Sequence, residues 1–278
     1  LKALSDFRKV QKTKSHGAEL VGINMEGPFI SREKCGAQDP QYIRPFDTEL
    51  FERFMCASDG LVRFMGVAPE RDGALGFIDD IRDRVCVTLA HTDADYEAAK
   101  AAIDHGASHI VHMYNAMRPF LSREPGVVGA AAERSEVTAE LICDGIHIHS
   151  ATVRATFEMF GRDRIILISD SMRATGLGDG TYTLGGQDVS VRGNCAELVS
   201  DGAIAGSVTC LPKCVKIAVK DMGIPMEDAI YASTHNPAMR LGILDEVGTI
   251  EPGKKADLLL LDPDMSVIRV MKNGQFID

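Results

Sequence analysis

The sequence of 278 residues contains no tryptophan and no dense cluster of lysine or arginine, and its formal net charge is -10. Proteins that bind nucleic acid usually carry a basic surface with stacking aromatic side chains, so these absences argue against that class. No apolar run approaches the roughly 18 residues that a membrane-spanning helix needs. The sequence therefore predicts no nucleic-acid or membrane partner, and any anionic ligand must be held by a few local groups.

Disulfide pairs and paired metal-binding cysteines are also not indicated. The seven cysteines form no CxxC pair and their number is odd, which favours reduced thiols and a cytoplasmic protein. What is present is ordinary globular composition, with 45% hydrophobic and 25% charged residues. The length suffices for one large domain, alone or with a small one.

Short apolar runs alternate with amphipathic segments along most of the chain. The runs predict strands at 19–26, 61–68, 85–90, 109–113, 137–143, 165–169 and 203–205, and the segments predict helices at 47–57, 73–84, 94–106 and 150–161. Further helices are expected within 207–242. This alternation indicates an α/β fold, and the length fits a (β/α)8 barrel of the TIM type, which takes about 250 residues.

Two segments depart from this rhythm. Residues 179–202 alternate in polarity between glycine turns and predict inserted β-hairpins. Residues 249–278 change to short strands with Pro-Gly and Asn-Gly turns. We therefore expect a barrel domain over 1–248 and the C-terminal part of a small β-sandwich domain over 249–278.

The first barrel strand is expected to be missing. Only seven strands are predicted, whereas a closed barrel has eight, and the opening segment LKALSDFRKVQKTK predicts a helix. The tail also offers too few strands for a stable sheet by itself. An upstream segment is therefore expected to supply the first barrel strand and the rest of the β-domain.

Polar residues follow the apolar runs, at the strand ends where a barrel carries its chemistry. A lone carboxylate at the end of a hydrophobic strand is costly to bury unless a cation meets it, so Glu26 requires a partner. Two histidines with one carboxylate match the protein ligands of a catalytic zinc site. The candidates at these positions are Glu26, Glu70, His91, His112, His147 and Asp170.

Each histidine also has a structural interpretation, because a single histidine at a strand end is more often hydrogen-bonded within the fold. His109 lies three positions before His112, so only one of the two is expected to face inward on a shared strand. His147 and His149 form an alternative metal pair if the strand continues that far. The three remaining histidines are expected in solvated loops or at helix ends, and they are His16, His105 and His235.

Seven motifs in order carry a resemblance to a known family. They are MEGPFIS, LAHT, HMYNAM, SREPG, CDGIHIH, ISDS and the AGS of residues 205–207. Together they resemble the N-acetylglucosamine-6-phosphate deacetylases of the amidohydrolase superfamily, at similar spacing through nearly the whole chain. The resemblance implies a metal-dependent hydrolase barrel with a small β-domain, in a homodimer. It also implies hydrolysis of the acetamido group of N-acetylglucosamine 6-phosphate to glucosamine 6-phosphate and acetate.

The resemblance also implies roles for particular residues. Glu26, His91 and His112 would bind one divalent metal, with zinc first and iron or another first-row ion as alternatives. Asp170 would be the catalytic acid and base, a role that suits a carboxylate at a strand end. A surface aspartate that caps the next segment is the alternative. The residues implied to hold the sugar phosphate are Asn115, Ala116, Arg123 and His147.

The phosphate contacts have a physical basis as well as an alternative. Arg123 offers a planar fork suited to phosphate, and the turn after His112 can present the main-chain N–H groups of Asn115 and Ala116. In the alternative interpretation, Arg123 is a solvated surface charge. Gln38, in KCGAQ, stands where many family members have a histidine that helps to polarise the substrate carbonyl. Its amide can donate a neutral hydrogen bond there but cannot become cationic.

Two other functions fit parts of the pattern. Another amidohydrolase, acting on a cyclic amide or a nucleobase, would use the same metal, although Arg123 and the NAM turn favour a phosphate-bearing ligand. A truncated non-catalytic paralogue is the third hypothesis. The presence of Glu26, His91, His112 and Asp170 together argues against it, because nothing structural requires that set.

Overall fold

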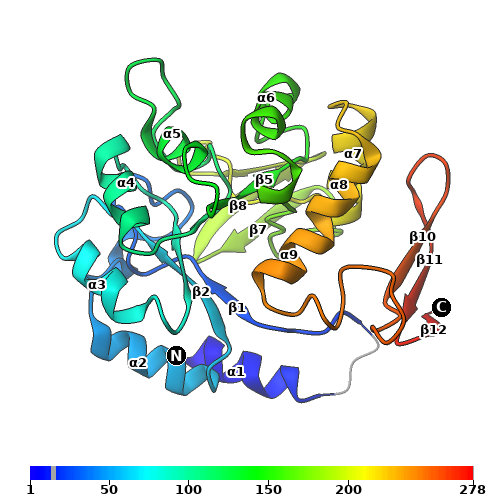
Figure 1. Cartoon of the computed structure of the whole chain (residues 1–278), viewed down its shortest axis with the longest axis horizontal. Helices are drawn as coiled ribbons and strands as arrows, with labels where there is room; N and C mark the ends of the chain where they lie inside the picture. The colour runs from blue at the N-terminus through cyan, green and yellow to red at the C-terminus, as the bar shows by residue number, and fades with distance from the viewer. Residues whose placement is uncertain (14–16, 278) are drawn as a thin grey trace. The chain divides into compact units, whose positions relative to one another are not determined.

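The computed structural model describes residues 1–13 and 17–277 (Figure 1). The chain divides into two compact units. The first comprises Leu1–Cys35 and Pro40–Val137, and the second comprises Gly36–Asp39 and Thr138–Asp278. His16, which was expected to be solvated, lies outside the described residues.

The first unit is built on four parallel strands that follow one another in chain order. These strands are β1 (Ile23–Met25), β2 (Val62–Val67), β3 (Cys86–Leu89) and β4 (His109–Ile110). The predicted strands 19–26 and 109–113 are therefore real but shorter. His112 lies beyond the end of β4, so the alternation of side chains between the two faces of a strand does not by itself place His109 and His112 on opposite faces. Both histidines are buried, and since both faces of such a sheet can be buried, the expectation that only one faces inward stays a prediction.

Helices connect these strands as the apolar spacing predicts, and each packs against the next along the chain. Asp47 and Asp95 start two of them, because each side chain accepts a main-chain N–H of the first turn. Phe29 at the end of the MEGPF motif packs 4.6 Å from the ring centre of Phe77. The helices are α1 (Lys2–Gln11), α2 (Thr48–Ser58), α3 (Ala74–Ile81), α4 (Tyr96–Asp104) and α5 (Gly126–Ala132), with a 3-10 turn at Pro40–Tyr42.

The second unit contains two parallel strands and its own helices. Strands β5 (Thr138–Ile142) and β6 (Ile165–Ile168) pair in parallel. The helices are α6 (Ser150–Phe160), α7 (Leu211–Lys220), α8 (Met226–Ser233) and α9 (His235–Arg240), with a 3-10 turn at Arg162–Arg164. Within the described ranges, no helix combines the length and the apolarity that crossing a membrane requires.

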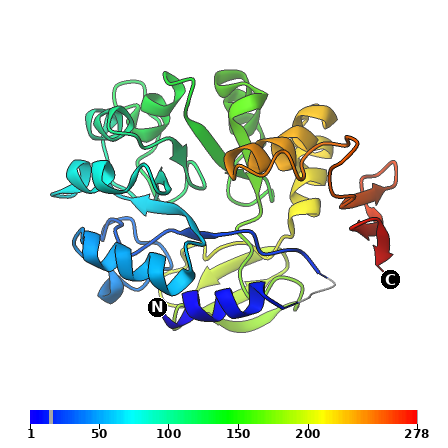
Figure 2. The same cartoon turned by 60° about the horizontal axis from the view of Figure 1, so that its bottom comes forward.

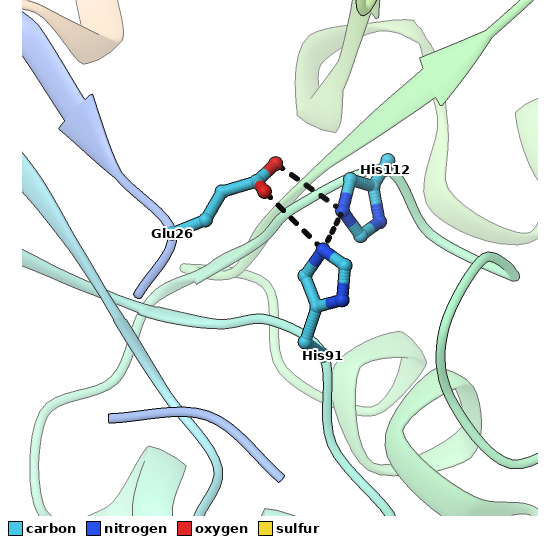
Figure 3. Close-up of side chains that lie close together, drawn as sticks. All are labelled: Glu26, His91 and His112. Atoms are coloured by element: carbon cyan, nitrogen blue, oxygen red, sulfur yellow. Dashed lines mark hydrogen bonds and ion pairs between the residues drawn. The ribbon is translucent and has the colours of Figure 1, made fainter. Parts of the chain in front are cut away.

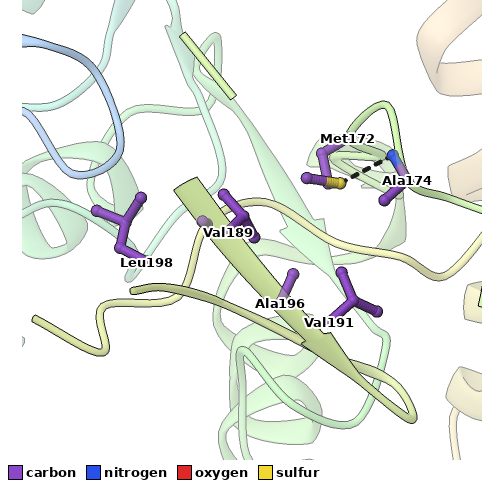
Figure 4. Close-up of a cluster of buried hydrophobic side chains, with 7 residues drawn as sticks. Met172, Ala174, Val189, Val191, Ala196 and Leu198 are labelled. Carbon is purple, nitrogen blue, oxygen red and sulfur yellow. Dashed lines mark hydrogen bonds between the residues drawn. The ribbon is translucent and has the colours of Figure 1, made fainter. Parts of the chain in front are cut away.

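The hairpins predicted for 179–202 are confirmed as a three-stranded antiparallel sheet, drawn in yellow-green in Figure 2. Its strands are β7 (Gly180–Leu184), β8 (Gln187–Arg192) and β9 (Cys195–Leu198). One face buries a small apolar core (Figure 4), made of Met172, Ala174, Val189, Val191, Ala196, Leu198 and Ala205.

This core corrects one prediction. Residues 203–205 form no strand: Ile204 makes a single antiparallel bridge to Glu197, and Ala205 packs into the core of the β7–β9 sheet. The apolar run serves the antiparallel sheet rather than a barrel strand. The described residues therefore contain six parallel strands where the sequence predicts seven.

The tail also forms the short strands that were predicted. They are β10 (Leu258–Leu261), β11 (Val267–Lys272) and β12 (Gln275–Ile277), paired in antiparallel order. This sheet lies wholly inside 249–278, but the proposed domain boundary before residue 249 stays a prediction.

Candidate metal centre

Three side chains of the first unit converge on one point (Figure 3). The Nε2 atom of His91 lies 3.2 Å from Glu26 Oε2, and the Nε2 atom of His112 lies 3.3 Å from Glu26 Oε1. The two Nε2 atoms are 3.0 Å apart. Tetrahedral ligands at zinc distances of about 2.0–2.1 Å lie about 3.3 Å from one another. The group therefore has nearly the spacing of three ligands of one metal ion.

Parallel strand order explains this convergence. Glu26 follows β1 directly, and His91 and His112 each stand two residues beyond the ends of β3 and β4. The carboxyl ends of parallel strands share one edge of a sheet, so residues there meet although they are far apart in sequence. Both histidines have positive φ angles, 46° and 30°. Such backbone is uncommon for residues other than glycine and is found disproportionately at functional sites.

A main-chain carbonyl fixes the orientation of His91. Its Nδ1 lies 2.8 Å from the carbonyl oxygen of Lys34. A carbonyl only accepts, so Nδ1 carries a proton, and Nε2 is the ring nitrogen that faces Glu26. A metal-binding histidine usually donates its second ring N–H in this way. The sequence motifs gave no indication of this contact, because its acceptor belongs to the backbone.

The electrostatics of Glu26 suit a cation. Burial raises the pKa of its carboxyl group, but hydrogen bonds and charge from His112 and His91 outweigh burial and hold the pKa well below the usual range. The carboxylate therefore stays ionised beside two imidazoles. One anionic oxygen ligand and two nitrogen ligands form a set that divalent first-row metals accept.

Gly66 makes room for Glu26, and sequence reasoning missed it. A Cβ atom added to Gly66 would lie 2.2 Å from the main-chain oxygen of Glu26, far inside van der Waals contact. Only glycine allows β2 to approach so closely at this point. A glycine near the end of a largely apolar strand was the available signal.

Glu70, another candidate, does not join the three ligands. Its carboxylate accepts hydrogen bonds from the Thr92 hydroxyl at 2.5 Å and from the Asp93 main-chain N–H at 2.7 Å. These contacts hold the segment that follows His91. Glu70 therefore supports the loop that carries the candidate metal ligand His91.

The predicted phosphate residues of this unit follow His112. The main-chain N–H of Asn115 donates to the His112 carbonyl at 3.0 Å, so that group is used inside the turn. Ala116 has a positive φ of 50°. Arg123 lies exposed in the loop before α5. Their part in substrate binding stays a prediction.

The remaining candidates lie in the second unit. Asp170 stands two residues beyond β6 with φ of 49°, which repeats the strand-end geometry of His91 and His112. Gln38 lies half-buried within Gly36–Asp39. His147 is bound through Nδ1 to the carboxylate of Asp144 at 2.8 Å.

The alternative metal pair of His147 and His149 is wrong. Strand β5 ends at Ile142, so the two residues do not share a strand face. His149 instead caps α6, its ring nitrogen accepting the main-chain N–H of Ala151 at 3.1 Å. Elsewhere, His105 is a half-exposed partner of Asp79, as expected for a helix end. His235 is half-buried and stacked on Tyr231, so it is less solvated than predicted.

Comparisons with known proteins identify relatives of the whole chain. A family model described as the amidohydrolase family matches residues 8–277. The N-acetylglucosamine-6-phosphate deacetylase of Bacillus subtilis is 40% identical over 270 residues, which cover 97% of this chain and 68% of that protein. An N-acetylgalactosamine-6-phosphate deacetylase of Escherichia coli O157:H7 is 34% identical over 260 residues, covering 93% of this chain and 68% of that protein.

A solved structure is similar over the same extent. It is a mutant N-acetyl-D-glucosamine-6-phosphate deacetylase from Mycobacterium smegmatis in complex with N-acetyl-D-glucosamine-6-phosphate. The TM-score is 0.92 at 38% identity, covering 99% of this chain and 72% of the other.

Proposed function

The chain belongs to the amidohydrolase family, and from that premise we propose that it hydrolyses the acetamido group of N-acetylglucosamine 6-phosphate to glucosamine 6-phosphate and acetate. The observation that carries the proposal is the convergence of Glu26, His91 and His112, whose ligand atoms all lie within 4.8 Å of one another. It occurs in a chain that is 40% identical to a deacetylase of that substrate.

The donor set fits a single divalent metal. Glu26 supplies a carboxylate oxygen, and the two histidines supply Nε2 atoms, that of His91 oriented by the Lys34 carbonyl. A bound divalent ion supplies Lewis acidity, which lowers the pKa of a coordinated water toward ~7 and polarises an amide carbonyl. Zinc suits these ligands, and iron or another first-row ion fits the same set.

Amide hydrolysis also needs a group that moves a proton from the attacking water to the departing amine. Asp170 is the residue we assign to this role, because a strand-end carboxylate can accept the first proton and later donate it. Its left-handed backbone resembles that of the proposed metal ligands His91 and His112. Its carbonyl accepts the main-chain N–H of Ser207 at 2.8 Å, which holds the strand end in place.

Substrate recognition is assigned to residues that flank these groups. Arg123 is proposed to bind the phosphate, since a guanidinium forms two parallel hydrogen bonds to phosphate oxygens. Asn115, Ala116 and His147 are proposed to hold the sugar phosphate with it. Gln38 is proposed to donate a neutral hydrogen bond to the acetamido carbonyl from its NH₂ group.

The setting of the enzyme is part of the proposal. All seven cysteines are free thiols, which supports a reducing compartment such as the cytoplasm. A TIM-type barrel and assembly as a homodimer are also part of the proposal. Sedimentation of the purified protein tests the homodimer directly, and a monomer at all concentrations would exclude it.

The test is hydrolysis of three substrates, measured as acetate release for two acetamido sugars and as ring opening for a cyclic amide. The protein should release acetate from N-acetylglucosamine 6-phosphate with stoichiometric glucosamine 6-phosphate. The C4 epimer is the second substrate, because one relative is named for it. A cyclic amide such as dihydrouracil is the third. Turnover of the cyclic amide alone would replace the proposal with the other amidohydrolase activity, and no turnover of any would favour a non-catalytic paralogue.

A further inference from the structure

Asp144 is a buried carboxylate that the proposed reaction does not use. It lies in the turn after β5 and is 3% exposed. Its Oδ1 accepts the main-chain N–H groups of Ile146 at 2.9 Å and His147 at 3.0 Å. Its Oδ2 accepts from Nδ1 of His147 at 2.8 Å and from the hydroxyl of Ser207 at 3.0 Å. Four donors thus converge on one carboxylate.

The direction of every hydrogen bond in this network follows from the charge of Asp144. Burial raises the pKa of Asp144, but the hydrogen bonds from the His147 ring and from the main-chain N–H groups of His147 and Ile146 lower it to about 2. An ionised carboxylate only accepts, so the Ser207 hydroxyl must donate to it. The Ser207 oxygen in turn accepts the main-chain N–H of Thr209 at 3.0 Å.

The same reasoning fixes the ring of His147. Its Nδ1 must carry a proton, because the acceptor opposite has none to give. Nε2 is therefore the ring nitrogen left for a ligand. The side chain of His147 is 5% exposed, so the turn that bonds it also restricts its rotation.

Ser207 connects this turn to the strand end of the proposed catalytic acid. Its main-chain N–H donates to the Asp170 carbonyl at 2.8 Å, while its hydroxyl donates to Asp144. One residue thus ties together the segments that carry Asp170 and His147. Gly206 permits this approach, since its φ is 66° and an added Cβ would lie 3.2 Å from the Asp170 carbonyl oxygen.

We propose that Asp144 is a positioning residue for the substrate site, holding His147 with Nδ1–H directed at its carboxylate so that Nε2 meets an oxygen of the sugar phosphate. The inference rests on the proposed function for the identity of that ligand. The Ser207 hydroxyl donates a second side-chain hydrogen bond to the Asp144 carboxylate and helps to hold it in place. A purely structural role in the turn is the competing explanation.

The first test is a double-mutant cycle with His147. Asp144→Asn should lower kcat/KM for N-acetylglucosamine 6-phosphate by about 10- to 100-fold, by analogy with the effect of losing a residue that orients a metal-binding histidine. In a His147→Ala background, Asp144→Asn should lower kcat/KM almost no further, because Asp144 acts through the His147 imidazole. An equal penalty in both backgrounds would show a structural role and overturn the inference.

Two matched variants accompany the cycle. Ser207→Ala removes one hydrogen bond to the carboxylate but leaves the one from His147, so its loss should be smaller than that of Asp144→Asn. Asp163→Asn removes an exposed carboxylate of the same unit and should leave kcat/KM unchanged. A loss for Asp163→Asn as large as that for Asp144→Asn would mean that net charge, rather than the geometry, causes the effect.

The second test does not depend on activity. Nitrogen NMR of protein labelled at histidine, with the His147 signal assigned from His147→Gln, should show a proton on Nδ1 in the folded protein at neutral pH. In Asp144→Asn the proton should redistribute toward Nε2. An unprotonated Nδ1 in the unsubstituted protein would overturn the inference. Absence of acetate release together with a protonated Nδ1 would reject only the proposed function.

Discussion

At the scale of single residues, position at a strand end distinguishes the candidate groups from the other polar residues. His91, His112 and Asp170 each stand two residues past a parallel strand, with left-handed backbone. Residues other than glycine rarely adopt that conformation unless the surrounding structure imposes it. Two predictions concern single side chains.

The first concerns Asp170. Asp170→Asn keeps the size of the side chain but cannot transfer a proton, so kcat should fall by about 10²- to 10⁴-fold. KM and metal content should change little, because binding groups remain. Steady-state kinetics and metal analysis measure these quantities. A variant with near-normal kcat would identify another group as the base.

The second concerns Arg123. Removing a charged hydrogen-bond donor that meets phosphate costs about 1.5–3 kcal/mol, so Arg123→Ala should raise KM for the phosphorylated sugar by about 10- to 100-fold. The KM for unphosphorylated N-acetylglucosamine should change little in Arg123→Ala. Arg53, exposed on α2, provides the control, since Arg53→Ala should alter neither KM. Equal effects of Arg123→Ala on both sugars would refute a phosphate contact.

At the scale of elements, close strand approach sets the position of Glu26. Gly66→Ala would place a methyl group against the Glu26 main chain, so we expect destabilisation by about 1–3 kcal/mol and weaker metal binding. Gly76 in α3 is the matched control, because an added Cβ there meets nothing within 4 Å and alanine favours a helix. Thermal unfolding and metal titration measure both effects. Unchanged metal affinity in Gly66→Ala would refute the positioning role of Gly66.

The elements also show how far sequence reasoning reaches. Helices were predicted well where one period dominates, as in α2 and α4, because burial of one face imposes that period. Strand β2 was predicted from its continuous apolar run. The run at 203–205 misled, since an apolar segment can serve an antiparallel sheet as well as a barrel. Glu26, His91 and His112 were predictable from motifs at strand ends. The Lys34 carbonyl and Gly66 were not, because their contacts join distant segments. Asp144 was not either, because its hydrogen bonds to Ile146 and His147 depend on the folded shape of the turn.

At the scale of the whole molecule, buried carboxylates link stability to pH. The pKa of Asp144 is about 2 in the fold, against an ordinary value of 3.8. A lowered pKa stabilises the protein above the ordinary value, and the contribution, about 2 kcal/mol, is lost as pH falls from about 4 toward 2. The difference in melting temperature between the unsubstituted protein and Asp144→Asn should therefore be largest above pH ~4 and shrink below it. A difference that is constant from pH 6 to pH 3 would contradict this account.

The central claim is that the deacetylation depends on a metal held by Glu26, His91 and His112. Metal content and acetate release, measured on the same samples, test it most directly. After removal by a chelator, activity should return in proportion to added metal and saturate at one ion per chain. Glu26→Gln, His91→Ala and His112→Ala should lose both properties, whereas His105→Ala, which changes a histidine on the surface of the same unit, should keep both. Full metal content in the three ligand variants, or full acetate release by the stripped protein, would contradict the account.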